Sequence, residues 1–205
     1  MLHKVNWSHN IIRGKVHKSV WYPRWMTIGD FDDGIFSRFC EGFNSILAQP
    51  QDIIPIIIDS NGGYVDSLMG MLDMIKSSPK PVATVVESKA NSCGAVLLSA
   101  GHRGYRFASP NSSILIHEVS SGTEGTATEI SNHFKETDKL NEKLMGILAM
   151  NSDKPKSFYK DLIKKNSNTD LYLSAKEAKK FGLIDQIGVP AFTMDINVKY
   201  SLKAV

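Results

Sequence analysis

The chain has 205 residues, of which 42% are hydrophobic and 22% are charged. This length and balance indicate one folded domain and exclude a disordered chain. The net charge of +3 is too small to indicate nucleic-acid binding. No apolar stretch of about 18 residues is present, and no apolar signal-peptide core follows the N-terminus. We therefore expect a cytoplasmic protein that does not contact a membrane.

The two cysteines, Cys40 and Cys93, are not spaced as metal ligands or as a disulfide framework. Cys40 lies in an apolar helical pattern, and Cys93 directly follows Ser92. Reduced thiols fit the cytoplasmic location that we expect. The sequence therefore predicts no metal and no cofactor.

Charge is distributed unevenly along the chain, because residues 1–29 contain five basic residues and no acidic residue. We interpret this segment as an N-terminal arm, which is either a solvated extension or a docking and gating segment. The main domain is then expected at 30–188, followed by a C-terminal tail at 189–205.

Hydrophobic periodicity predicts an alternation of helices and strands over the first two-thirds of the chain. Apolar residues at helical spacing predict helices, and short β-branched runs predict buried strands. The expected helices are 31–48, 65–75 and 90–100, and the expected strands are 53–58, 82–86, 105–107 and 114–116. Such an order is typical of an α/β fold with a parallel sheet.

The last third of the chain begins with a long helical pattern at 126–150. A helix of this length is unusual in a small α/β domain, so we expect it to project and pack against another copy. A shorter helix is expected at 155–165, with Pro155 in its first turn. Ser174 to Glu177 has the pattern of a capping box, Gly182 fits a helix stop, and a strand is expected at 183–187.

Four features of the sequence match what a serine hydrolase requires. Ser92 follows a strand and begins a helix, where backbone N–H groups are unpaired. The turn 61–63 also follows a strand and has two glycines, which can expose an N–H to a ligand. His117 ends an apolar strand, and Asp170 precedes the capping box. Taken singly, each has a structural alternative: an N-cap serine, a plain turn, a core histidine and a turn aspartate.

Taken together, the segments resemble the proteolytic subunit of the Clp protease over roughly residues 50–188. Residues 60–63 resemble the family's Ser-Pro-Gly-Gly turn, and residues 91–95 resemble its Ala-Ser-Met-Gly-Ala nucleophile segment. Residues 110–117 resemble the strand that leads to its catalytic histidine. Residues 122–130 resemble its glycine-rich strand and the start of its handle helix, and residues 170–185 resemble its aspartate region and closing strand.

The resemblance implies a Ser-His-Asp triad of Ser92, His117 and Asp170, in an ATP-independent serine endopeptidase that cleaves unfolded polypeptides. It also implies an oxyanion hole formed by the backbone N–H groups of Gly63 and Cys93. Substrate would pair as an extended strand with a short segment, a mode that gives affinity with little sequence preference. The residues of this segment are Ser120, Ser121, Gly122, Thr123, Glu124 and Gly125.

The implied fold is a ClpP/crotonase-like spiral of ββα units with a projecting handle helix at about 126–150. The implied assembly is a homo-oligomer, a heptameric ring that can stack into a tetradecamer and form a closed barrel. An AAA+ unfoldase would feed this barrel. The chain has no phosphate-binding-loop pattern, so any use of ATP is expected to belong to that partner.

Three departures from the family pattern leave alternatives open. Asn61 stands where the family has proline, Val119 stands where proline is common, and residues 168–169 lack the usual acidic and arginine pair. One alternative is a non-catalytic ring subunit of a mixed barrel. Another is a crotonase-type acyl-CoA enzyme, which shares the fold and a similar pair of N–H donors without needing a triad.

Overall fold

The computed structural model describes residues 23–167 and 170–192, which form one α/β domain. Most of the predicted arm and tail therefore lie outside the described residues. The strands are β1 Met26–Ile28, β2 Ile54–Ser60, β3 Val82–Asn91, β4 Arg106–Ala108, β5 Ser113–Ile116, β6 Leu171–Ser174 and β7 Gln186–Ile187. The helices are α1 Ile35–Leu47, α2 Val65–Lys76, α3 Cys93–Ser99, α4 Ala127–Asn151, α5 Phe158–Lys165 and α6 Ala175–Phe181.

The strands form one sheet in the order β1-β2-β3-β4-β7, and all neighbours in this path run parallel. Strand β5 also pairs parallel with β3, but beyond the end of β4, at Lys89–Asn91. Strand β6 pairs antiparallel with β5. The α/β class and the parallel sheet expected from the sequence are confirmed, and the arrangement as a spiral of ββα units remains a prediction.

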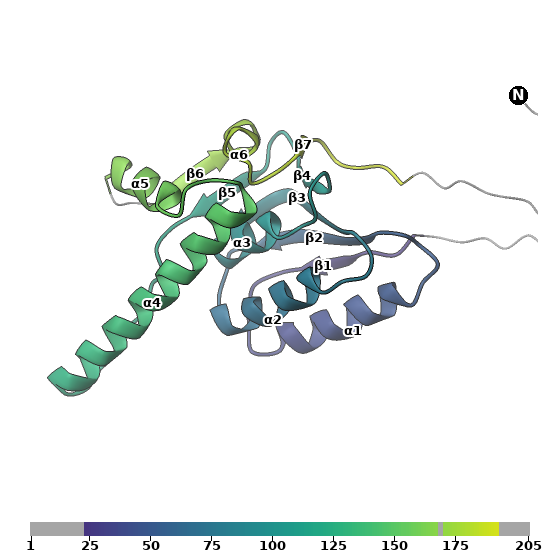
Figure 1. The fold of residues 1–205 in the computed structure, drawn as a ribbon. Coiled ribbons are helices and arrows are strands. Elements are labelled where there is room, and N and C mark those ends of the chain that lie inside the picture. Colours follow the sequence, from purple (N-terminus) through teal and green to yellow (C-terminus); the bar gives the residue numbers. More distant parts are fainter. Residues whose placement is uncertain (1–22, 168–169, 193–205) are drawn as a thin grey trace, which may run out of the picture.

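The core lies between the sheet and the helices that follow its strands. Helices α1 and α2 lie side by side along one side of the sheet (Figure 1). On α1 the rings of Phe39 and Phe43 stack with their centroids 5.4 Å apart, as their spacing of one helical turn allows. Every residue of α3 is buried, which explains the small and apolar side chains of this short helix.

Helix α4 extends away from the body of the domain (Figure 1). It begins with a capping box in which Thr126 and Glu129 bond each other's backbone N–H. Leu144 and Leu148 near its other end are buried in the core, whereas Ile130 and Phe134 in its outer half are 46% and 70% exposed. The projection expected from the sequence is therefore present, and its apolar outer residues have no cover from the described chain.

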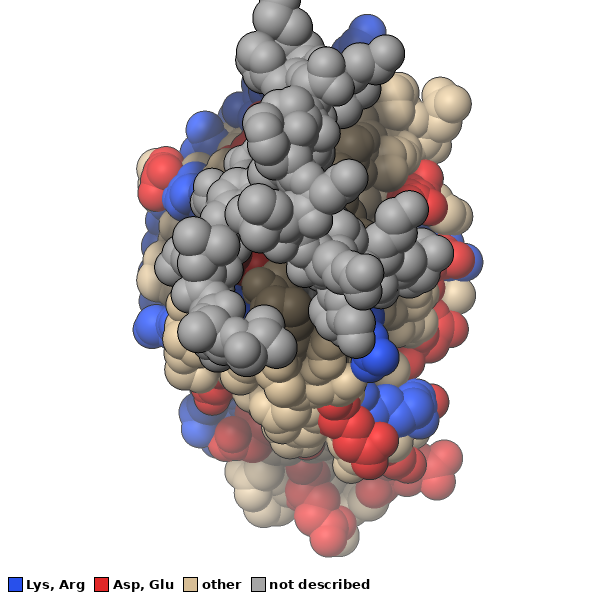
Figure 2. All heavy atoms as spheres, turned by 90° about the vertical axis from the view of Figure 1, so that its right-hand side faces the viewer, with Lys and Arg blue, Asp and Glu red and all other residues tan. Residues whose placement is uncertain are grey.

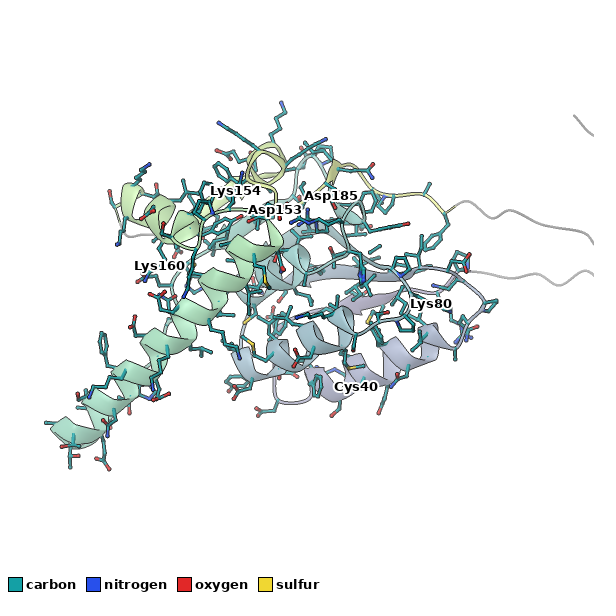
Figure 3. All side chains as sticks on the ribbon, viewed as in Figure 1. Cys40, Lys80, Asp153, Lys154, Lys160 and Asp185 are labelled. Atoms are coloured by element: carbon teal, nitrogen blue, oxygen red, sulfur yellow. The ribbon has the colours of Figure 1, made fainter. Side chains whose placement is uncertain are left out.

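Helix α5 packs against the base of α4, where Lys160 reaches Glu142 and forms an ion pair (Figure 3). Pro155 was expected in the first turn of this helix, but α5 begins only at Phe158. The reason is a separate turn before the helix, which the Phe158 N–H closes by donating to the Pro155 carbonyl over 2.9 Å. The capping box at Ser174 and the left-handed Gly182 that ends α6 are both as predicted.

Several other boundaries differ from those expected, and α1 begins at Ile35 instead of residue 31. Strand β1 lies within the stretch assigned to the arm, so the sheet begins before residue 30. Strand β3 continues to Asn91, because pairing with β5 extends it, and α3 therefore begins at Cys93 instead of residue 90. Only residues 186–187 of the expected last strand are paired, as β7. Strand β6 carries no clear period-2 pattern and was not predicted.

Both Lys or Arg and Asp or Glu side chains are present on the visible part of the face in Figure 2, with Asp and Glu at its lower end. This mixture agrees with the small net charge of the chain. Among the helices of the described residues, none has the length and apolar character needed to cross a bilayer.

A buried ion pair joins β4 to the residue that precedes β7. Arg106 is 1% exposed and donates to both carboxylate oxygens of Asp185, over 3.0 and 2.5 Å. A further N–H of the guanidinium donates to the carbonyl of Asn151 at the end of α4, over 2.8 Å. Burial disfavours the charged form of Asp185, but the hydrogen bonds and charge of Arg106 outweigh it and lower the pKa of this carboxyl.

Replacing Asp185 with asparagine is expected to lower the free energy of unfolding by about 3 kcal/mol, because Arg106 stays buried without a counter-charge. Since the folded-state pKa of Asp185 is lowered, its contribution is present above the unfolded carboxyl pKa and is lost as the pH falls through the folded-state pKa. Urea denaturation at neutral and acidic pH measures both effects.

The matched control is Asp153→Asn, which removes the exposed partner of Arg103. Because that pair is solvated, the control should lose less than about 1 kcal/mol. Equal losses in the two variants would contradict the role given to the buried pair.

Candidate active site

Ser92 lies in the sharp turn between β3 and α3, with φ 54° and ψ −117°. A positive φ is unfavourable for a residue with a side chain and costs about 1–3 kcal/mol, so surrounding contacts must hold it. One such contact is the Ser92 N–H, which donates to the Leu115 carbonyl of β5 over 2.9 Å. Ser92 is the N-cap residue of α3, but its hydroxyl makes no capping hydrogen bond.

The glycine turn after β2 lies directly against Ser92. A Cβ added to Gly62 would come within 2.6 Å of the Ser92 Cβ, so only glycine allows this approach. Both Gly62 and Gly63 have positive φ, at 101° and 134°. The turn is fixed from its other side by Phe31, whose N–H donates to the Gly62 carbonyl over 2.8 Å.

Asn61, in the same turn, bonds to Asp30 through its backbone and its side chain. The Asn61 N–H donates to one carboxylate oxygen over 2.6 Å, and its side-chain amide donates to the other over 3.2 Å. The backbone hydrogen bond from Asn61 is the largest cause of the lowered pKa of Asp30. The carboxylate thus stays ionised at neutral pH and holds the glycine turn in place.

His117 directly follows β5 and faces the same pocket as Ser92. This cavity has a volume of about 60 Å³, and apolar residues from several elements form most of its wall. The lining residues are Gly63, Val65, Ser92, Val96, Ile116, His117, Val119, Ser120, Leu144, Met145 and Leu148. The structure thus brings two predicted catalytic residues and one predicted oxyanion donor to a single cavity.

Asp170 lies beside His117 in the strand register but is not joined to it. The last pair of the β5–β6 ladder is Ile116 with Leu171, so one further step sets His117 opposite Asp170. The Asp170 side chain is exposed, and its carbonyl accepts a hydrogen bond from Asn166 over 2.9 Å. Among the described residues, no hydrogen bond links His117 to Ser92 or to Asp170. Catalytic hydrogen bonds are often long in structures without substrate, so the missing bonds do not exclude the triad, which stays a prediction.

Cys93 connects the nucleophile turn to the glycine turn. Its thiol donates to the Gly63 carbonyl over 3.2 Å, a contact that the sequence pattern did not reveal. Burial raises the pKa of this thiol to about 11. The thiol is therefore neutral near pH 7 and is not a competing nucleophile to Ser92.

The backbone N–H groups of Gly63 and Cys93 were the predicted oxyanion donors. Within residues 23–167 and 170–192, neither N–H donates to a backbone carbonyl. For Cys93 the reason is its place at the first position of α3, where the N–H has no partner within the helix. Two N–H groups that donate to no backbone carbonyl of the described residues thus belong to the turns around Ser92.

The predicted substrate segment, residues 120–125, is exposed and contains neither helix nor strand. Two side chains of α4 hold the stretch that contains it. The Val119 N–H donates to the Asn141 side chain over 3.2 Å, and the Ser121 hydroxyl lies 2.6 Å from the Nε2 of His133. The sequence did not identify these contacts, nor the part of the pocket wall that Leu144 and Leu148 supply from the base of α4.

The family model described as Clp protease matches residues 27–191, which are most of the chain. The match begins within β1 and extends beyond β7, so it includes Ser92, His117 and Asp170. The family resemblance noted in the sequence is thereby confirmed.

Replacing Gly63 with alanine is expected to lower the free energy of unfolding by about 2 kcal/mol, because the backbone keeps a positive φ. The new Cβ would also collide with the Phe31 carbonyl oxygen. Gly29→Ala is the matched control, since no atom lies within 4 Å of its added Cβ. Chemical denaturation measures both changes, and equal stability of the two variants would contradict the geometry of the turn.

Proposed function

We propose that this chain, which belongs to the Clp protease family, is a serine endopeptidase with Ser92 as nucleophile. The observation that carries the proposal is the strained Ser92, with φ 54°, in one cavity with His117 and Gly63. Strained residues that their surroundings hold in place are typical of catalytic sites. The family match supports a peptidase, and the site supports the serine type.

In the proposed reaction, the Ser92 hydroxyl oxygen attacks the carbonyl carbon of the scissile peptide bond. His117 takes the hydroxyl proton and then gives it to the leaving amine, so the C–N bond breaks and an acyl-enzyme remains. A water molecule, deprotonated by His117, then hydrolyses the ester and restores Ser92. Asp170 would hold the imidazole in the tautomer that accepts the proton, which requires its side chain to turn toward His117.

The negative charge of the tetrahedral intermediate needs donors that are already in place. We assign this role to the N–H groups of Gly63 and Cys93, which donate to no backbone carbonyl among the described residues. The thiol of Cys93 bonds to the Gly63 carbonyl, so the two donor residues are fixed relative to each other. The partial positive charge at the start of α3 acts in the same direction.

The proposed substrate is an unfolded polypeptide that pairs with residues 120–125 as an added strand. This segment is exposed and has backbone groups available for such pairing, which suits binding with little sequence preference. The apolar wall of the cavity beside Ser92 would receive a side chain of the substrate.

We further propose that the chain self-associates into a heptameric ring, and that two rings can stack into a closed barrel fed by an AAA+ unfoldase. The exposed apolar residues Ile130 and Phe134 on the projecting half of α4 support self-association. The chain would cut without ATP, and any ATP use would belong to the partner.

A non-catalytic ring subunit is the second candidate function. The exposed side chain of Asp170, which forms no hydrogen bond to His117 among the described residues, is the observation that favours it. A crotonase-type acyl-CoA enzyme is not favoured, because the family match is to Clp protease.

Replacing Ser92 with alanine should lower hydrolysis of a short fluorogenic peptide by at least about a thousandfold, because the acyl-enzyme cannot form. The particle mass should stay the same, since the Ser92 hydroxyl does not cap α3. Ser45→Ala, at an exposed position of α1, is the control and should keep full activity.

Activity of the Ser92→Ala protein close to that of the unchanged chain would exclude the proposed nucleophile. A fully assembled particle without any peptidase activity would instead support the non-catalytic subunit.

Replacing Phe134 with serine should lower the particle mass at a given concentration, because each buried phenylalanine contributes about 1.5–3 kcal/mol to association. Lys135→Ser introduces the same side chain one position later, where no apolar area is lost, and should assemble normally. Sedimentation velocity measures both masses, and unchanged assembly of the Phe134→Ser protein would remove α4 as the interface.

A further inference from the structure

A buried asparagine of α4 bonds to the chain just beyond His117. Asn141 is only 7% exposed, and its side-chain oxygen accepts the Val119 N–H over 3.2 Å. Because the donor is an N–H, the amide oxygen must face Val119. The side chain of Val119 and the residue after it, Ser120, both line the cavity that contains Ser92.

We propose that Asn141 is a positioning residue, which holds the segment from His117 to Gly125 in the place where the base and the bound substrate need it. This inference rests on the proposed peptidase function, since it assigns a role within that same site. Asn141 itself touches neither the reacting atoms nor the catalytic side chains among the described contacts, so it acts through Val119.

The segment from His117 to Gly125 makes few other hydrogen bonds to the described residues. Between residues 118 and 125, the hydrogen bonds in the described part of the chain are those of the Val119 N–H and the Ser121 hydroxyl. The partner of Ser121 is His133, which lies two helical turns before Asn141, a separation of about 12 Å along α4. The segment is thus held against α4 at two points, of which the Asn141 contact is partly buried and the His133 contact is exposed.

The hydrogen bond to Asn141 depends on the residue type at position 119. In the Clp resemblance, a proline is common at this position, and proline fixes its own φ but has no N–H to donate. Val119 lacks that stiffness and supplies a donor instead. A buried acceptor facing that donor restores the constraint through a hydrogen bond, and removing either partner would release the segment.

The experiment is a double-mutant cycle on hydrolysis of a fluorogenic peptide by the full chain. Asn141→Leu removes the acceptor and should lower kcat/KM about tenfold, the effect of losing one buried hydrogen bond. Asn141→Asp keeps an acceptor oxygen at the same place and should stay within about threefold of the unchanged chain. In a Val119→Pro background, Asn141→Leu should cause no further loss, because no donor remains.

A separate readout does not depend on activity. Hydrogen–deuterium exchange of the Val119 amide should be slow in the unchanged chain and in Asn141→Asp, and faster by at least about tenfold in Asn141→Leu. Ser152→Ala is the matched control at the C-cap of the same helix. Its hydroxyl donates to the Leu148 carbonyl over 2.6 Å, and Ser152 itself does not line the cavity. It should lower thermal stability without changing kcat/KM or the Val119 exchange.

Wild-type kcat/KM together with slow Val119 exchange in Asn141→Leu would overturn the inference. So would an equal loss from Asn141→Leu in both backgrounds, because the effect would then not pass through Val119. The proposed function fails on a different result, namely activity that persists in Ser92→Ala, and the exchange measurement then still decides whether Asn141 holds the segment.

Discussion

Strand β3 changes its neighbour along its length, and this change determines where the catalytic candidates lie. Its first half pairs with β4 at Thr84–Val86, and its last residues pair with β5 at Lys89–Asn91. The parallel pairing with β5 continues into the Ser92 N–H, which bonds to the Leu115 carbonyl. Serine and histidine therefore leave the carboxyl ends of adjacent parallel strands, the edge at which ligands bind in α/β sheets. If this pairing were lost, Ser92 would have no support for its positive φ, and His117 would lie elsewhere.

Hydrogen bonds replace proline at two points around this site. Asn61 stands where the resemblance noted in the sequence has proline, Val119 stands where proline is common, and each donates an N–H that proline could not supply. Asn61 donates to the carboxylate of Asp30, and Val119 donates to the side chain of Asn141. The glycine turn and the segment after the histidine are thus held by contacts from other elements. This solution makes the site depend on α4 and on the residues after β1, since those elements carry the acceptors.

The sequence predicts the parts of the structure that local patterns determine. Period-3.6 apolar residues indicated α1, α2 and α4, and the Ser174 capping box with Gly182 marked both ends of α6. The order of Ser92, the glycine turn and His117 indicated the site, because strand ends gather at one edge of a parallel sheet. The extension of β3 to Asn91 and the existence of β6 depend on pairing between distant segments, which no local pattern reveals. The links from Asn141 and Cys93 were missed for the same reason, since each joins residues that only the fold brings together.

Ser92 is the proposed nucleophile, and covalent labelling detects its activation by a base. A fluorophosphonate reacts with a serine hydroxyl that a general base activates, and mass spectrometry of the digested protein locates the adduct. We expect one adduct, on Ser92, that forms much more slowly in a His117→Ala variant. An adduct on a different serine, or equal labelling of Ser92 with and without His117, would contradict this proposal.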